Sequence, residues 1–192
     1  MEEAEIIAGL ATDAPGYYIW SAKLLGKCDY LKPLLTSPDK HARYHGALAL
    51  ALLDDSSAAT VEVLCSCALE TDGFRPTSGR KYVYPRSVSA IYALGRIGSP
   101  LALPVLYQLL EETPSIPFQP DQLLTDQGDV EFQYHSHTVA ALLEIAKAVP
   151  TEREAIFRKL AAALDADPLS VSLMGGPLRA EYRESFRKLL DM

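Results

Sequence analysis

The stretch that decides the fold reads PRSVSAIYALGRIGSPLALPVLYQLLEE and covers residues 85–112. Its first half places apolar or small residues at positions 88, 91, 94 and 98, which is the spacing of one helix face. Ser99 and Pro100 follow as a helix-start signal, because serine can accept a hydrogen bond from a free N–H of the first turn and proline is tolerated there. Leucine and valine then recur at positions 101, 105, 106, 109 and 110. The stretch therefore predicts two amphipathic helices joined by a tight turn.

Weaker copies of this unit occur on both sides of it. SAKLLGK (21–27) aligns without gaps on AIYALGR (90–96), and residues 42–51 carry small and apolar residues in the order of 86–95. A small residue at the equivalent place recurs at intervals of 25, 44 and 51 residues, namely at Gly26, Ala51, Gly95 and Ala146. Two irregular segments, at about 71–84 and 113–134, lie inside the longer intervals, and a period of about 30 remains without them. We therefore expect one repeat domain over residues 1–192 with two loop insertions.

This pattern resembles the short bacterial HEAT repeats that are also called PBS-lyase-type HEAT repeats. Their loose motif V-R-x-x-A-A-x-A-L-G is matched by ARYHGALALA at 42–51, and SPD at 37–39 stands where the family often has an Asp-Pro-Asp turn. The AIYALGRIG half of residues 86–98 also matches, although Arg86 comes one place early. The resemblance covers about residues 17–165 and implies an all-α fold, a right-handed α-solenoid of about four to five helical pairs. It is specific for the fold only, since such repeats serve adaptors, enzyme accessory domains and DNA-binding enzymes.

Composition narrows the classes of function. The chain of 192 residues has a formal net charge of −7, which argues against general affinity for nucleic acid. No apolar run approaches the length of a membrane span, and the N-terminus carries acids where a secretory signal would carry bases. We therefore expect a cytoplasmic protein without membrane association. The three cysteines, Cys28, Cys65 and Cys67, lie in helical patterns and are interpreted as buried, reduced thiols.

The two insertions differ in charge. Residues 74–86 contain four bases, three aromatic residues and no acid, whereas residues 113–134 contain four acids and no base. Because both fall between the first and second helix of a repeat, we expect them on the same edge of the array. One interpretation is that the basic loop binds an acidic peptide, a phosphate or a carboxylate. The other is that the two loops pack on each other and neutralise their charges, and both interpretations stay open.

A second candidate surface is the row of second helices, which line the inner surface of HEAT arrays. Tyr17, Ala42, Arg86 and His137 are aligned near the starts of these helices. The row that would make that surface polar and aromatic consists of Tyr17, Tyr18, Arg43, Tyr44, Arg86 and His137. Ordinary solvation of helix ends is the alternative interpretation. Together the two surfaces give the predicted partner-binding residues: Tyr18, Arg43, Tyr44, Arg75, Arg80, Lys81, Tyr82, Tyr84, Arg86, Tyr92 and His137.

Histidine pairs are the candidate metal ligands of the sequence. His41 and His45 lie at i and i+4, but the glutamate of an H-E-x-x-H site is missing and the pair His135 and His137 lies two repeats away. Serine-nucleophile motifs, phosphate-cradling glycine loops and CxxC pairs are also missing from the sequence. We therefore predict no metal site, no catalytic residue and no cofactor. The last predicted helix, 178–190, carries an arginine every four residues and is interpreted as a solvated cap.

These observations predict a non-enzymatic protein-interaction or scaffold module. Its partner would be another protein or an acidic peptide, and the chain would act as a monomer or as part of a larger complex. The alternative is an enzyme or enzyme-associated domain, either a relative of HEAT-fold DNA glycosylases or a bilin lyase-like protein. The glycosylase resemblance implies a basic concave face with Trp and Asp at its centre. Here the net charge is −7 and the single tryptophan, Trp20, lies in the first repeat.

Overall fold

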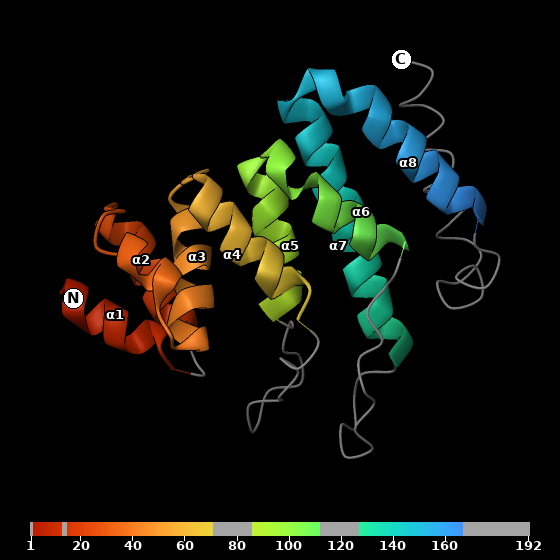
Figure 1. The fold of residues 1–192 in the computed structure, drawn as a ribbon. Coiled ribbons are helices and arrows are strands. Elements are labelled where there is room, and N and C mark those ends of the chain that lie inside the picture. The colour runs from red at the N-terminus through yellow and green to blue at the C-terminus, as the bar shows by residue number, and fades with distance from the viewer. Residues whose placement is uncertain (1, 13–14, 71–85, 112–126, 167–192) are drawn as a thin grey trace.

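The computed structural model describes residues 2–12, 15–70, 86–111 and 127–166. Within these ranges the regular structure is entirely helical, as predicted (Figure 1). The α-helices are α1 (Glu3–Leu10), α2 (Gly16–Leu25), α3 (Lys40–Leu52), α4 (Ala58–Ala68), α5 (Arg86–Ile97), α6 (Leu103–Glu111), α7 (Gln127–Ala148) and α8 (Arg153–Ala166). Three short 3-10 helices join them: η1 (Lys32–Thr36), η2 (Pro100–Ala102) and η3 (Pro150–Glu152).

The helices stack in a repetitive order. α2, α3, α5 and α7 contact one another in succession, and α1 packs on α2 and α3 at one end. α4 lies against α3 and α5, while α6 and α8 both lie against α7. Figure 1 shows α4, α6 and α8 running in the same direction across this row. The arrangement is consistent with the predicted α-solenoid, in which each helical unit contacts only its neighbours.

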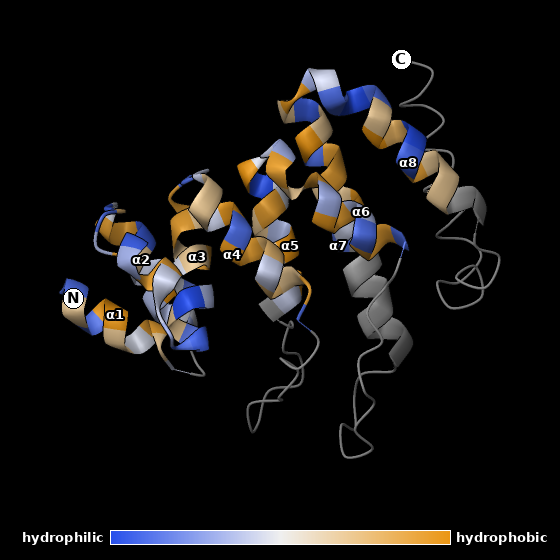
Figure 2. Ribbon diagram, in the orientation of Figure 1, coloured by the Kyte–Doolittle hydropathy of each residue, from blue (hydrophilic) through white to orange (hydrophobic). Residues whose placement is uncertain are grey.

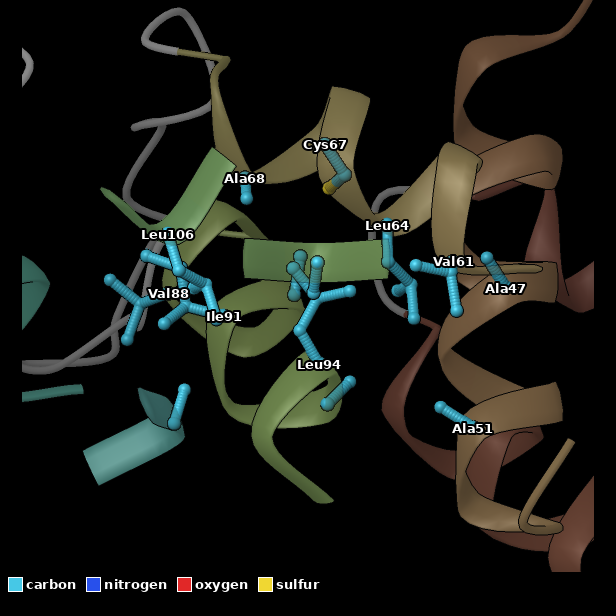
Figure 3. Close-up of a cluster of buried hydrophobic side chains, with 14 of the residues drawn as sticks. Ala47, Ala51, Val61, Leu64, Cys67, Ala68, Val88, Ile91, Leu94 and Leu106 are labelled. Atoms are coloured by element: carbon cyan, nitrogen blue, oxygen red, sulfur yellow. The ribbon is translucent and has the colours of Figure 1, made fainter. Parts of the chain in front are cut away.

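One hydrophobic core runs through the stack. In its middle, Ala47 of α3 meets Val61 and Leu64 of α4, and Ile91 and Leu94 of α5 complete the cluster (Figure 3). All five side chains are buried, and burying a leucine or isoleucine contributes about 1.5–3 kcal/mol. Figure 2 shows hydrophobic and hydrophilic residues alternating along the helices, which is the amphipathic pattern expected from the sequence. The buried positions at 88, 91, 94 and 98 confirm the predicted inner face of α5.

The contact between α5 and α7 depends on a glycine. A Cβ atom on Gly95 would lie 2.6 Å from the Cα atom of Ala141 and 2.9 Å from its Cβ atom. A side chain at this position would force the two helices to shift, because real Cβ atoms essentially never approach a backbone atom so closely. Gly95 therefore allows the backbones of α5 and α7 to approach closely.

Helix starts follow the predicted signals in part. The Asp39 carboxylate accepts a hydrogen bond of 3.0 Å from the Ala42 N–H at the start of α3. The hydroxyl oxygen of Ser99 similarly accepts one of 3.4 Å from the Leu101 N–H, although the turn that it opens is η2 rather than an α-helix. The residues TERE at 151–154 have the spacing of a capping box, but no side chain caps η3. Val149 takes the cap position there, and its carbonyl accepts a hydrogen bond of 3.0 Å from the Glu152 N–H in η3.

The positions at which the helices end show that the predicted alignment of the repeats needs correction. Gly26, Asp54 and Gly98 adopt positive φ angles of 69°, 61° and 67°, and they follow the ends of α2, α3 and α5. A left-handed residue just after a helix is a recurrent stop signal, for which glycine is preferred. Gly26 is therefore equivalent to Gly98, and its predicted equivalence to Gly95 is wrong by three residues. Gly98 and Gly95 are required for different reasons. Gly98 adopts the left-handed conformation that ends α5, whereas Gly95 leaves room for the neighbouring helix α7.

Two further expectations are corrected by the structure. The second insertion was predicted to end near residue 134, but α7 already begins at Gln127. Valine, phenylalanine and tyrosine at positions 130, 132 and 134 alternate with polar residues, a spacing that does not reveal a helix. Leu101 was assigned to the inner stripe of the following helix, yet it is mostly exposed because it lies in η2, and Leu103 is buried instead.

Candidate partner-binding face

The corrected alignment brings out a row of exposed side chains. The residues six places before the left-handed positions are Trp20 on α2, Leu48 on α3 and Tyr92 on α5. Trp20 is 58% exposed, Tyr92 is 60% exposed, and Leu48 between them is partly buried. The three residues hold equivalent positions before the ends of α2, α3 and α5, and these helices contact one another in succession. We call this set the Trp20–Tyr92 row.

On α2 the exposed apolar surface is longer. Tyr17, Trp20 and Leu24 are 68%, 58% and 85% exposed, and they lie at i, i+3 and i+7 on one helix face. We call these three residues the α2 stripe. Ala22 is buried on the opposite face. The ammonium group of Lys23 lies 4.9 Å from the centroid of the Trp20 ring, a cation–π contact at the border of the stripe.

Of the α2 stripe only Tyr17 was recognised from the sequence, and its neighbour Tyr18 was predicted to bind a partner. The Tyr18 ring covers Gly9 of α1, where an added Cβ atom would lie 2.2 Å from a ring carbon. Tyr18 is therefore partly buried in the contact between α1 and α2, and its neighbour Tyr17 is the exposed tyrosine. The i, i+3, i+7 spacing was a visible signal, but α2 is apolar on every face. Spacing alone could not tell which face is covered.

Arg43 and Tyr44 were also predicted to bind a partner, and the structure gives both an internal role. Tyr44 is only 4% exposed, and its hydroxyl group donates a hydrogen bond of 2.9 Å to the Glu70 carboxylate. Lys40 forms an ion pair with the same carboxylate. Burial, with Glu70 adding to it, raises the pKa of Tyr44. Arg43 donates a hydrogen bond of 2.6 Å to the Ser37 carbonyl and lies over the Tyr44 ring at 5.3 Å.

The proposed equivalence of Tyr17, Arg86 and His137 near helix starts does not hold. Arg86 is the first residue of α5, but the corrected alignment places Ser89 opposite Tyr17. His137 is partly buried and lies in the middle of α7, because that helix begins ten residues earlier, at position 127. Five of the predicted site residues lie outside the described residues: Arg75, Arg80, Lys81, Tyr82 and Tyr84. The predicted C-terminal helix at 178–190 lies outside them as well.

Charges near the Trp20–Tyr92 row are mostly paired. Arg96 donates a hydrogen bond of 2.9 Å to Asp54, and Lys27 donates one of 3.2 Å to Glu3. Exposed pairs of this kind contribute roughly 0–1 kcal/mol each, so they orient side chains more than they stabilise the fold. The row therefore consists of apolar and aromatic surface with charged groups at its border. Such a surface suits contact with another apolar surface.

The histidines take structural positions. His45 is buried, and its Nδ1 atom lies 2.8 Å from the Leu10 carbonyl oxygen, which links α3 to the end of α1. The rings of His41 and His45 have centroids 5.8 Å apart. Within residues 2–12, 15–70, 86–111 and 127–166, no group of three or more His, Cys, Asp or Glu side chains is placed to hold a metal ion.

Comparison with known families agrees with this architecture. The family model of the PBS lyase HEAT-like repeat matches residues 88–112, which span most of α5, η2 and α6. The match supports the resemblance to HEAT repeats drawn from the sequence, over residues 88–112. No curated protein and no solved structure matches the chain. None of the helices in the described part of the chain is both long and apolar enough to cross a membrane.

Proposed function

We propose that this protein is a non-enzymatic interaction or scaffold module that binds a partner protein on the Trp20–Tyr92 row. The observation that carries the proposal is the exposure of two large aromatic side chains at equivalent positions of α2 and α5, the helices on either side of α3. Tryptophan and tyrosine dominate the binding energy of many protein interfaces, because they bury a large area with few rotatable bonds. Trp20 and Tyr92 expose large aromatic surface that the described part of the chain does not cover, whereas a partner would cover it.

The repeat architecture supports the same proposal. A stack of helical units offers an extended surface whose positions repeat from one unit to the next. Here the equivalent position holds Trp20, Leu48 and Tyr92, so a partner can make the same kind of contact on three successive helices. The match to a HEAT-like repeat fits this role, since helical repeat proteins often serve as interaction modules.

A site-specific cross-linking experiment tests the proposal. A photo-reactive phenylalanine analogue placed at Trp20 or at Tyr92 should give one discrete cross-linked protein in cells of the source organism. The matched control carries the analogue at Arg158, which is exposed on α8 away from the row, and it should give none. Tyr92→Ala should then weaken binding of the captured partner at least tenfold, without lowering the melting temperature. Equal cross-linking at all three positions, or none at Trp20 and Tyr92, would contradict the proposal.

The basic loop belongs to this proposal as a second contact region. Its residues Arg80 and Lys81 would add charge-assisted contacts to an acidic partner. The double variant Arg80→Glu with Lys81→Glu should therefore lose the captured partner while the helical circular dichroism and melting temperature stay nearly unchanged. A much lower melting temperature would instead support the interpretation that the two insertions pack on each other.

A further inference from the structure

We propose that the partner contacts α2 with an amphipathic α-helix that carries acidic residues along one border. This inference rests on the proposed function and specifies the chemistry of the partner at one end of the binding face. It follows from three properties of the α2 stripe: its direction, its area and the charges beside it.

The direction of the α2 stripe favours a helix. Tyr17, Trp20 and Leu24 follow the axis of α2 over seven residues, which corresponds to about 10 Å at 1.5 Å per residue. A partner helix that packs alongside presents its own residues at i, i+3, i+4 and i+7 to such a line. An extended peptide would instead follow the Trp20–Tyr92 row from α2 to α5, across the helices, and would leave most of the stripe uncovered.

The area of the stripe favours a single helix over a second copy of this chain. Three partly exposed side chains of this size form a patch of roughly 300–500 Å². A stable dimer buries about 800 Å² on each partner, with packing like that of a protein interior. The stripe is too small for this on its own, but it has the size of the apolar face of a short amphipathic helix.

The charges beside the stripe favour an acidic partner. The segment 14–28 contains Lys23 and Lys27 and no aspartate or glutamate, in a chain whose net charge is −7. Lys23 lies over the Trp20 ring at the border of the stripe, whereas Lys27 follows the end of α2 and is paired with Glu3. Carboxylates on a docked helix would approach Lys23 there. A basic partner helix would meet like charges at close range, which is unfavourable.

Selection from a peptide library tests the inference. A displayed library of 16-residue helix-forming peptides is selected against the full chain and counter-selected against the variant Leu24→Glu. Enriched peptides should have apolar residues at i, i+3 or i+4, and i+7, with glutamate or aspartate along one border. Binding of one synthesised winner is then followed by tryptophan fluorescence, since Trp20 is the only tryptophan of the chain. A saturable blue shift is expected, because the docked helix removes water from the indole ring.

Matched variants separate the contribution of the Lys23 charge to binding from that of charges elsewhere on the protein. Lys23→Glu should weaken the acidic peptide at least tenfold, whereas Lys159→Glu, a charge reversal on α8, should leave its affinity unchanged. Peptides without helical spacing, peptides with a neutral or basic border, or no enrichment at all would each overturn the inference. A blue shift that grows with protein concentration alone would overturn it as well, since it would indicate self-association. If cross-linking at Tyr92 still captures a partner in any of these cases, the proposed function stands. Only the inference that an acidic helix binds on α2 is then refuted.

Discussion

At the scale of the residue, Tyr44 joins two helices through its hydroxyl group. The group donates to Glu70, which follows the end of α4, while Tyr44 itself belongs to α3. We predict that Tyr44→Phe lowers the free energy of unfolding by about 1 kcal/mol, which is the typical net contribution of one hydrogen bond. Urea denaturation followed by circular dichroism measures this change.

The control for Tyr44→Phe is the same substitution at Tyr92, which lies on α5. Tyr92→Phe also removes a hydroxyl group, but at an exposed position, so the free energy of unfolding should stay unchanged. Partner binding by Tyr44→Phe should equal that of the wild type. If Tyr44→Phe loses binding and keeps its stability, the internal role that we assign to Tyr44 is wrong.

Cys65 allows a prediction on pH. Burial is the main cause that raises the pKa of this thiol from 9.0 to about 11. Only the thiolate reacts with iodoacetamide, so alkylation of Cys65 at pH 8 should be about 100-fold slower in the folded protein than in urea. The unfolded thiol ionises first, and the contribution of Cys65 to stability is therefore lost as pH rises from 9 to 11. Peptide mass spectrometry after timed alkylation checks the rate, and equal rates would contradict the burial.

At the scale of the element, the crossing of α5 and α7 depends on the absent side chain of Gly95. Gly95→Ala should gain about 1 kcal/mol in helix propensity and lose about 1–3 kcal/mol to overpacking. The Ala141 Cα atom cannot rotate away, so we expect the loss to dominate, with a net destabilisation of about 1–2 kcal/mol. Thermal unfolding of the variant measures it.

The matched control for this glycine is Gly16, the first residue of α2. A Cβ atom at Gly16 meets no atom within 4 Å, and its φ angle is not positive. Gly16→Ala should therefore leave stability unchanged or raise it slightly. If Gly95→Ala and Gly16→Ala both unfold like the wild type, Gly95 of α5 does not pack against Ala141 of α7 as closely as the structure indicates.

The positions of the helices were largely predictable from the sequence. The packing of each helix face against neighbouring helices was less predictable. The starts at Asp39 and Ser99 and the buried face of α5 follow local rules of hydrogen bonding and helix spacing, so short stretches of sequence suffice. The assignment of Tyr18 to a binding surface failed because α2 is apolar all round. Only the position of α1 decides that Gly9 is covered by Tyr18 and that Tyr17 stays in water.

At the scale of the whole molecule, the effect of a core substitution on stability depends on where the substituted helix lies in the stack. α5 has its main contacts with α3, α4 and α7, whereas α1 has its main contacts with α2 and α3 among the described helices. Leu94→Ala removes a buried side chain at the centre, at a cost of about 2–5 kcal/mol, and should raise amide hydrogen exchange throughout α3–α7. Ile6→Ala, equally buried on α1, should raise exchange chiefly in α1 and α2.

This comparison distinguishes a stack from a single cooperative core. In a repeat array, stability is approximately the sum of unit terms and nearest-neighbour terms, so an end opens without the centre. Hydrogen exchange with mass spectrometry resolves the helices separately. If Ile6→Ala and Leu94→Ala raise exchange over the same helices, the chain unfolds as one body and the stacked-unit description is wrong.

The sequence by itself determined that this chain is helical, that its helices recur as units, and that it resembles HEAT repeats. These properties depend on residue spacing and on hydrogen bonds within a few residues of each other, which the order of amino acids specifies directly. The tertiary structure alone decided that Gly26 corresponds to Gly98, that Tyr44 is internal, and that Tyr17, Trp20, Leu24 and Tyr92 are exposed. Such facts depend on which neighbour covers each helix face, and residues distant in the chain supply that cover.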